Sequence, residues 1–200
     1  MSTDLRSTVK RVLRVLFLGL ALPFWASFRL LSAIGNRDAV FYAHTQLLSL
    51  LPGTIGVWLR GAFLRLSTPD TDQDIAVCFG AILSHVDTTI ERGVYVGPQC
   101  NVGSCRIGRG TLLGSGVHVL SGSNQHSFAD PDRPIQEQEG AYRKVRIGAD
   151  CWLGNGAIVM NDVGDRGIVA AGSVVVHPVE PGTIVAGNPA RPVRQRDPSG

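Results

Sequence analysis

The stretch from Val145 to Arg194 decides the fold of this 200-residue chain. It begins VRIGADCWLGNGAIVM (Val145–Met160) and ends VAAGSVVVHPVEPGTIVAGNPARPVR (Val169–Arg194). Apolar residues recur there at every sixth position, and a small residue follows many of them. A period of six fits neither an α-helix nor an alternating strand. It fits a coil of short strands in which every sixth side chain points inward and glycine permits tight corners.

The same six-residue step occurs upstream of this stretch. One residue is missing from the step between Val102 and Ile107, and two are missing between Val159 and Val163. Repetition of this kind indicates a solenoid, in which each unit buries its apolar face by stacking on the next. Cys78 lies six positions before Ser84, so we expect it to point inward too. The predicted inward positions are Ser84, Ile90, Val96 and Val102; Ile107, Leu113 and Val119; Ile147, Leu153 and Val159; and Val163, Val169 and Val175.

From about Cys78 to Arg194 the chain resembles the hexapeptide-repeat acyltransferases. The motifs that carry the resemblance are IGADCWLGNGAIV (Ile147–Val159), AAGSVV (Ala170–Val175) and AGNPARPVR (Ala186–Arg194). They resemble most the branch that acetylates sugar hydroxyls, which includes maltose, galactoside and nodulation-factor acetyltransferases. The resemblance implies an all-β solenoid, a left-handed parallel β-helix with three hexapeptides per coil. It also implies a homotrimer with sites between neighbouring subunits.

Charge is distributed unevenly along the chain. Residues 1–66 contain eight Lys/Arg and two Asp, a net charge of +6, whereas the remainder carries −3. Such asymmetry indicates a basic end that meets an anionic surface. We therefore predict a basic apolar helical, membrane-associated segment (1–66), a β-helix acyltransferase domain (67–194) with a loop at 121–144, and a C-terminal tail (195–200). The four cysteines show no CxxC pair or Cys/His ligand spacing, which favours reduced thiols in the cytosol.

The front segment contains two apolar stretches, VLFLGLALPFWASF (Val15–Phe28) and LLSLLPGTIGVWL (Leu47–Leu59). The longer uncharged run has 14 residues, short of the ~20 that a spanning helix needs. A signal peptide would need a small-residue cleavage site, and none is clear. An interfacial or re-entrant helical pair fits better, and a helical lid packed on the solenoid end or on a trimer surface is the alternative.

Particular residues have predicted roles in such a helical pair. Trp25 and Trp58 would anchor it at the interface, and flanking arginines, Arg60 among them, would meet anionic headgroups. Pro23 and Pro52 would break or bend the two helices.

A polar segment, SGSNQHSFADPDRPIQEQEGAYRK (Ser121–Lys144), interrupts the repeats. Long loops that leave a compact solenoid are usually functional. In the resembling family a loop at this point, after a coil like GSGVHVLSG (Gly114–Gly122), carries the catalytic histidine. The resemblance therefore implies that His126 is the general base. Imidazole suits the role because it is largely neutral at pH 7 and can accept a proton from a sugar hydroxyl.

The resemblance also implies the other site residues. Two arginines would lie near the phosphates of acetyl-CoA, since guanidinium binds phosphate through bidentate bonds; a solvated C-terminal tail is the alternative for them. Trp152 would form a wall beside His126 of an adjoining subunit. The acceptor-binding positions are Gln99, Asn101, Asn124 and Trp152, and the cofactor-binding positions are Asn155, Ala171, Val176, His177, Arg191 and Arg194.

The predicted function is O-acetyl transfer from acetyl-CoA to a saccharide hydroxyl, with no metal. The basic apolar front favours a lipid-linked or surface-polysaccharide precursor as acceptor, at the cytoplasmic face of the cell membrane. Of the remaining histidines, we expect His44 to be interfacial, His85 to face outward, and His118 to lie at the surface or reach an acceptor groove.

Three rival functions have weaker support. A γ-type carbonic anhydrase needs three histidines around zinc, and no third ligand stands at that family's spacing beside His118 and His126. A non-catalytic solenoid scaffold would cleave no thioester, and an acyl-carrier-protein donor fits the C-terminal motifs less well than coenzyme A. Nucleic acid is not a predicted partner, because the basic residues interleave with aliphatic ones rather than forming a stacking surface.

Overall fold

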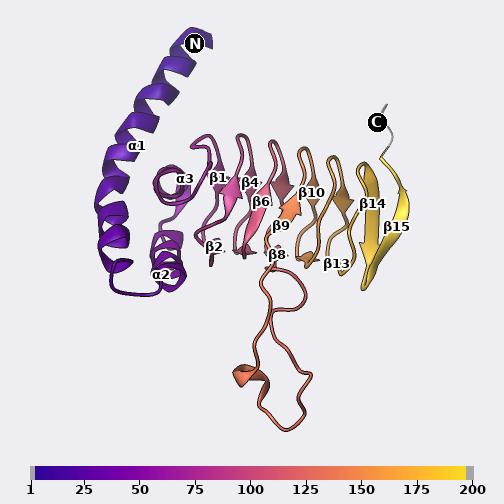
Figure 1. The fold of residues 1–200 in the computed structure, drawn as a ribbon. Helices are drawn as coiled ribbons and strands as arrows, with labels where there is room; N and C mark the ends of the chain where they lie inside the picture. Colours follow the sequence, from indigo (N-terminus) through magenta and orange to yellow (C-terminus); the bar gives the residue numbers. More distant parts are fainter. Residues whose placement is uncertain (1–2, 197–200) are drawn as a thin grey trace.

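The repeats wind into a three-sided prism of parallel strands (Figure 1). The computed structural model describes residues 3–196, with side chains from residue 8 onward. Face A consists of β1 (Ala76–Val77), β4 (Tyr95–Val96), β7 (Leu112–Leu113), β10 (Trp152–Leu153), β12 (Ile168–Val169), β14 (Thr183–Gly187) and β15 (Ala190–Gln195). Face B consists of β2 (Ile82–Leu83), β5 (Asn101–Val102), β8 (His118–Val119), β11 (Ile158–Val159) and β13 (Val174–Val175). Face C consists of β3 (Thr89–Ile90), β6 (Cys105–Ile107) and β9 (Val145–Ile147), extended by single bridges at Val163 and Val179.

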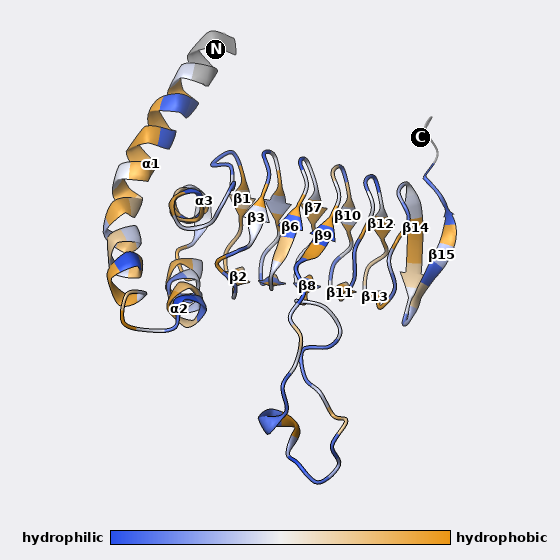
Figure 2. Ribbon diagram, in the orientation of Figure 1, coloured by the Kyte–Doolittle hydropathy of each residue, from blue (hydrophilic) through white to orange (hydrophobic). Residues whose placement is uncertain are grey.

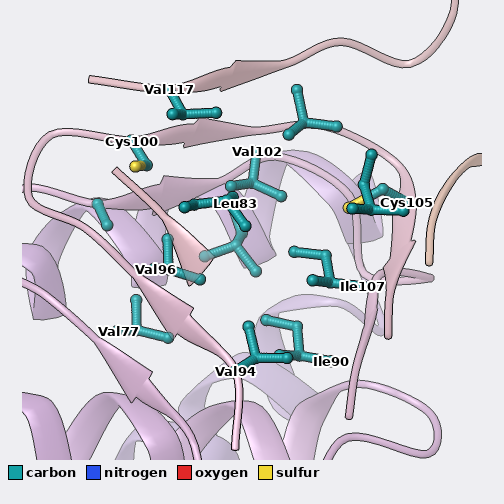
Figure 3. Close-up of a cluster of buried hydrophobic side chains, with 14 of the residues drawn as sticks. Val77, Leu83, Ile90, Val94, Val96, Cys100, Val102, Cys105, Ile107 and Val117 are labelled. Atoms are coloured by element: carbon teal, nitrogen blue, oxygen red, sulfur yellow. The ribbon is translucent and has the colours of Figure 1, made fainter. Parts of the chain in front are cut away.

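The two-residue strands each send one apolar side chain into the prism interior, β6 and β9 send two each, and these side chains stack from coil to coil (Figure 3). Twelve of the thirteen predicted inward positions are buried, and Ser84 is the exception. The residue buried in its place is Leu83, and likewise Val77 is buried where Cys78 was expected. Both predictions were wrong because the step from Leu83 to Ile90 has seven residues, which shifts the earlier positions by one.

All irregular steps occur at one edge of the prism, the corner between face B and face C. The step there is seven residues from Leu83 to Ile90, five from Val102 to Ile107 and four from Val159 to Val163. The long loop also leaves at this corner, between β8 and β9. At the other two corners every step is six. The chain therefore keeps two edges uniform and places its variation on the third.

Three helices cover the N-terminal end of the prism (Figure 1): α1 (Thr3–Leu31), α2 (Arg37–Ser49) and α3 (Gly53–Ser67). Pro52 separates α2 from α3, as predicted, and is the N-cap residue of α3. Pro23 lies inside α1 without ending it, so the prediction for Pro23 was wrong where it required a break. The uncharged run ends at Phe28, but the helix extends beyond the run on both sides and is 29 residues long.

Two polar residues of the front segment are buried rather than at an interface. His44 is 8% exposed, lies 2.6 Å from the Ser27 hydroxyl and stacks on Phe63. Arg60 is 3% exposed and donates hydrogen bonds to the carbonyl oxygens of Leu48, Leu51 and Val77. The predictions of an interfacial His44 and a headgroup-binding Arg60 were therefore wrong. Orphan carbonyls at the end of α2 attract the guanidinium, and burial lowers its pKa.

By length and composition alone, residues 8–31 of α1 could cross a membrane. A signal sequence or a buried core helix would meet the same criterion, although only 11% of the window is buried here. Figure 2 shows apolar residues along most of α1. Trp25 and Trp58 are half-buried: the Arg29 guanidinium lies over Trp25, and Trp58 packs against Phe17.

The C-terminal end of the prism closes with a hairpin. β14 pairs with β15 in antiparallel fashion, and Gln195 lies opposite Thr183. The predicted tail therefore begins inside a strand, and Arg196 still pairs with Asp150. The rest of that predicted tail, residues 197–200, lies outside the described part of the chain.

Candidate functional site

The loop that carries His126 projects from the B/C edge as two arms (Figure 1). The arms are joined at the base, where the backbone N–H of Arg143 donates to the Ser121 carbonyl (2.8 Å) and that of Ala141 to the Asn124 carbonyl (2.7 Å). A Cβ on Gly140 would meet the Gln125 carbonyl, so only glycine lets the arms approach this closely. His126 and Asn124 are both solvent-exposed on the first arm. The paired arms thus fix where the segment that carries His126 extends from the prism.

Further out, the tip of the loop is held by one buried amide. Gln138 accepts from the Asp130 N–H and donates to the carbonyls of Asp130 and Arg133. The tip contains a single turn of 3-10 helix (Ile135–Glu137). The exposed Phe128 and Ile135 leave apolar surface on this part of the loop.

A hollow of about 430 Å³ lies on face B at the foot of the loop. Asn101 and His118 are paired in register on adjacent strands, and both contribute to its wall. Gln125, the neighbour of His126, closes the loop side. The lining is Ser84, His85, Asn101, Gly103, His118, Val119, Leu120, Ser121, Gln125 and Ile158. Amide, hydroxyl and imidazole groups therefore converge on a space large enough for a small polar ligand.

Ser84 and His85 were not predicted for this hollow. The Ser84 hydroxyl lies 2.8 Å from Nδ1 of His85, and the His85 ring packs 5.6 Å from the Tyr142 ring on the second loop arm. His85 thus faces outward as predicted, but it does so into the hollow. The seven-residue step at this corner places both residues at the B/C edge. A search for the corner with irregular steps would have found them.

Two predicted cofactor residues are neighbours on the edge between face A and face B. The Gly172 N–H donates to the Asn155 carbonyl, which stacks the corner of Ala171 on that of Asn155. The Asn155 side chain accepts from the Ser115 N–H of the preceding coil. Gln99 stands on the same edge, in the left-handed region with a φ of 59°. Gln99 therefore lies on the A/B edge in line with Asn155 and Ala171, whereas Asn101 lies on face B itself.

Val176 and His177 lie on the opposite edge of face B, close to the base of the loop. The Asn161 amide donates to the Val176 carbonyl and accepts from Arg143 of the loop base. Arg143 also forms an ion pair with Asp162. The predicted cofactor residues consequently occupy both edges of face B, with the strands β11 and β13 between them.

The predicted arginines lie at the C-terminal end of the prism. Arg191 and His177 line a second hollow of about 370 Å³, which also includes Glu180. Arg194 is exposed on β15 opposite Ile184 and is not part of that lining.

Trp152 is on a different face from the hollow. It is 54% exposed on face A, paired with Leu112 and Ile168 in the neighbouring strands. Tyr95 continues the row beyond Leu112. Within one chain, Trp152 therefore does not meet His126.

The buried thiols are unsuited to nucleophilic chemistry. Burial raises the pKa of Cys100 to about 11 and that of Cys105 to about 12, and it also raises the pKa of Cys151. A thiol needs a lowered pKa to react as thiolate near neutral pH. Within residues 3–196, no group of three or more His, Cys, Asp or Glu is arranged to hold a metal ion.

The prism and its loop define a class of protein, the parallel β-helix with a polar hollow beside an ejected loop. No family model matches the chain. A probable macrolide acetyltransferase of Lysinibacillus sphaericus is 31% identical over 113 residues, which cover 51% of this chain and 63% of that protein. Nodulation protein L of Rhizobium meliloti is 42% identical over 95 residues, 46% of this chain and 49% of that protein. The chain thus spans less than two thirds of either relative.

A solved structure of similar fold is the maltose O-acetyltransferase from Clostridium difficile 630. Its TM-score is 0.68 at 19% identity, and the match covers 82% of this chain and 91% of that one. The predicted fold class, a left-handed parallel β-helix with an N-terminal helical segment, is confirmed. The resemblance to the hexapeptide-repeat acyltransferases is likewise confirmed, because the curated relatives include proteins named as acetyltransferases.

Proposed function

We propose that this protein moves an acetyl group from acetyl-CoA to a hydroxyl of a saccharide. The observation that carries the proposal is the polar hollow on face B, which lies at the foot of the loop that bears His126. The hollow has the volume and the mixed lining of a small-ligand site. The relatives named as acetyltransferases agree with this reaction class.

His126 is the general base in this proposal. Its imidazole takes the proton from the acceptor hydroxyl as the oxygen attacks the thioester carbonyl. A backbone N–H at a coil corner stabilises the tetrahedral oxyanion. Collapse of the intermediate breaks the C–S bond, and the departing thiolate receives the proton from the imidazolium. The acetyl group passes directly to the acceptor, so the buried thiols take no part.

The acceptor lies in the hollow. Asn101 and Gln125 offer amide groups, which both donate to and accept from sugar hydroxyls. His118 and His85 provide further polar contacts. Asn124 lies next to this group on the loop, and Gln99 is a weaker candidate because it lies on the other edge of face B.

Acetyl-CoA lies along the edges of face B. The corners at Asn155 and Ala171 present backbone groups that suit the pantetheine amides, and Val176 and His177 flank the other edge. Arg191 and Arg194, both exposed on β15, are placed to meet phosphates.

A homotrimer completes the site. Tyr95, Leu112 and Trp152 form a row of exposed apolar side chains on face A, which a neighbouring subunit would cover. In that assembly Trp152 of one subunit forms the wall beside His126 of the next.

The acceptor is held at a membrane, as a lipid-linked saccharide or a surface-polysaccharide precursor on the cytoplasmic face. The basic charge of residues 1–66 and the exposed apolar surface of α1 support this location. Acetyl transfer to lipid-linked and free sugars, measured side by side, tests it. Turnover with free mono- or disaccharides alone would overturn the lipid-linked acceptor.

The central experiment measures thiol release from acetyl-CoA by His126→Ala with candidate glycans. We expect kcat to fall by about 10²–10⁴-fold, the usual effect of removing a general base. The unfolding temperature should stay that of the wild type, since His126 is exposed. His118→Ala and His85→Ala serve as comparisons, with smaller losses expressed mainly in KM for the acceptor. A larger kcat loss in either of these than in His126→Ala would reassign the base. A wild-type protein that cleaves no thioester with any glycan would favour a scaffold.

A further inference from the structure

We infer that α1 lies in the plane of an anionic membrane, with its outer face in the lipid, and does not cross the bilayer. The inference deepens the membrane location proposed above and is independent of the acetyl-transfer chemistry. It rests on three properties of α1: its outer face, its contacts with the body of the protein, and its charge.

The outer face of α1 is apolar over five turns. Val15 and Leu30 are 67% and 73% exposed, and charged residues are absent from the helical positions between them on that side. A helix that is apolar on both sides is buried in a protein core or in a membrane. The face from Val12 to Leu30 has a length of about 27 Å at 1.5 Å per residue. Its exposed members are Val12, Val15, Leu16, Gly19, Pro23, Ala26 and Leu30.

The inner face of α1 is attached to the protein from Arg14 to Phe28. Phe17, Ala21 and Phe28 are buried against the other helices and the first coil. Before the middle of the helix, Gln73 donates a hydrogen bond to the Arg14 carbonyl (2.8 Å), and the Arg14 guanidinium forms an ion pair with Asp74.

The ion pair also shifts the pKa of the Asp74 carboxyl. Burial would raise the pKa of Asp74, but hydrogen bonding and charge interaction with Arg14 and Arg92 outweigh it and lower that pKa. Near the other end of the helix, the Ser27 hydroxyl pairs with the buried His44. The helix is therefore attached by polar contacts at Arg14 and at Ser27.

These attachments exclude the spanning orientation for the folded protein. If α1 crossed the bilayer while attached, Gln73, Asp74 and Arg92 of the first coil would enter hydrocarbon, where charged groups are strongly disfavoured. If it detached, three buried apolar side chains would lose their packing. In the plane of the membrane, α1 keeps every inner contact and covers its outer face.

The charge of α1 favours lipid over a second copy of the chain. Residues 8–31 contain Lys10, Arg11, Arg14 and Arg29 and no acidic residue. Basic residues beside an apolar helical face bind anionic headgroups. Two copies packed through this face would bring arginines together without a carboxylate from either helix.

Vesicle binding by the full chain tests the surface. We expect the wild type to co-float with phosphatidylcholine–phosphatidylglycerol vesicles and to bind pure phosphatidylcholine vesicles several-fold less. The double variant Val12→Glu/Leu16→Glu should bind the anionic vesicles at least about tenfold less. The matched control Ile135→Glu/Val193→Glu adds the same charge at exposed apolar positions outside α1 and should bind as the wild type does.

Equal binding by both double variants would overturn the assignment of this surface. A wild type that ignores vesicles but loses subunits when Val12 and Leu16 are replaced would show that a second copy covers the face. His126→Ala should bind vesicles normally, so a failure of the catalytic proposal remains distinguishable from a failure of this one.

Cysteine labelling tests the orientation. In a Cys78→Ala background, Thr8→Cys and Ile34→Cys place thiols at the two ends of α1. On sealed anionic vesicles, an impermeant maleimide added outside should label both thiols to the same extent. A spanning helix would leave one end unlabelled until the vesicles are permeabilised, and that result would overturn the in-plane orientation.

Discussion

The helical layer and the prism satisfy their polar groups by different means. In the prism, backbone N–H and C=O groups pair with the next coil, and the interior holds apolar side chains with a few hydroxyls. Thr111, for example, donates to the Gly148 carbonyl and accepts from the Cys151 N–H. In the helical layer a buried cation, Arg60, donates to the carbonyls of Leu48 and Leu51 at the end of α2 and to the carbonyl of Val77 in strand β1 of the prism.

The difference shows where each part of the molecule is vulnerable. The prism depends on close backbone approach between coils, so an added methyl group should break it. The helical layer depends on single polar side chains that bridge several elements, so truncation should break it. The loop uses both devices, because its arms approach closely at Gly140 and the Gln138 amide holds its tip.

The largest loss of stability should come from adding a side-chain carbon where the backbones of two coils are in contact. A Cβ on Gly108 would lie 2.5 Å from the backbone of Gly148 and Ala149, whereas a Cβ on Gly110 would meet nothing within 4 Å. We expect Gly108→Ala to lower the free energy of unfolding by about 3 kcal/mol or more, because backbone cannot yield. Gly110→Ala should lower it by only about 1–2 kcal/mol, the strain of a left-handed alanine at a φ of 70°. Urea unfolding measures both, and equal losses would contradict the close-approach argument.

The next effect concerns the buried cation. Arg60→Met should lower the free energy of unfolding by about 2–4 kcal/mol, because buried carbonyls lose charged hydrogen bonds. Arg65→Met, on the exposed side of the same helix, should change it by less than about 0.5 kcal/mol.

Tryptophan fluorescence reports where the damage from Arg60→Met occurs. Trp25 and Trp58 lie in the helical layer and Trp152 lies in the prism, so a Trp152→Phe background restricts the signal to the helices. Equal stability of the Arg60 and Arg65 variants would refute the bridging role of Arg60.

A smaller effect, on activity alone, should come from the loop. Gly140→Ala forces the second arm away from Gln125 and from the His126 backbone. We expect kcat/KM to fall by about 10–100-fold, since misplacing a catalytic group by about 1 Å has effects of that size. The unfolding midpoint should not change. Glu139→Ala, at the exposed neighbouring position, should leave both quantities unchanged; a lower melting temperature for Gly140→Ala would mean that the loop supports the prism.

The smallest effect is a loss of stability at alkaline pH caused by ionisation of a buried thiol. It is confined to the prism, since the described helices contain no cysteine. Burial raises the pKa of Cys105 to about 12, so the unfolded chain loses this proton first, near pH ~8.5. The thiol's contribution to stability is complete below that pH and declines as the pH rises toward the folded pKa. The decline is about 1.4 kcal/mol per pH unit. Unfolding of Cys105→Ala between pH 7 and pH 10 should show a shallower slope than the wild type, and parallel curves would contradict the prediction.

Much of the prism could be predicted, because its signal is local and repeated. The positions from Ile90 to Val175 were predicted correctly, including the shortened steps, since each step can be read against its neighbours. The inward predictions for Ser84 and Cys78 were wrong because both residues precede the lengthened step, and no earlier coil reveals the shift. The predicted break at Pro23 was wrong because packing of Phe17 and Phe28 on the rest of the protein outweighs the local preference of proline for ending a helix.

The candidate site was predicted only in part. The loop and its resemblance predicted His126, which lies on the loop beside the hollow, and the resemblance alone predicted Asn101, which lines the hollow. Ser84, His85 and Gln125 were missed, because the irregular step at the corner is the signal for Ser84 and His85 and no local signal marks Gln125. His44 and Arg60 were assigned to an interface because a basic or aromatic residue in an apolar stretch is equally consistent with a buried role.

The amino-acid sequence by itself determined that the chain coils and which side chains from Ile90 onward point inward, because each step of the period ends at a buried position. Only the tertiary structure decided which corner absorbs every irregular step, and therefore which edge gathers the loop, the hollow and its histidines. The physical reason is that residues about seventeen apart, such as Asn101 and His118, become neighbours only when one coil hydrogen-bonds to the next. Tertiary packing also decided that one side of α1 contacts the rest of the protein and the other side is exposed.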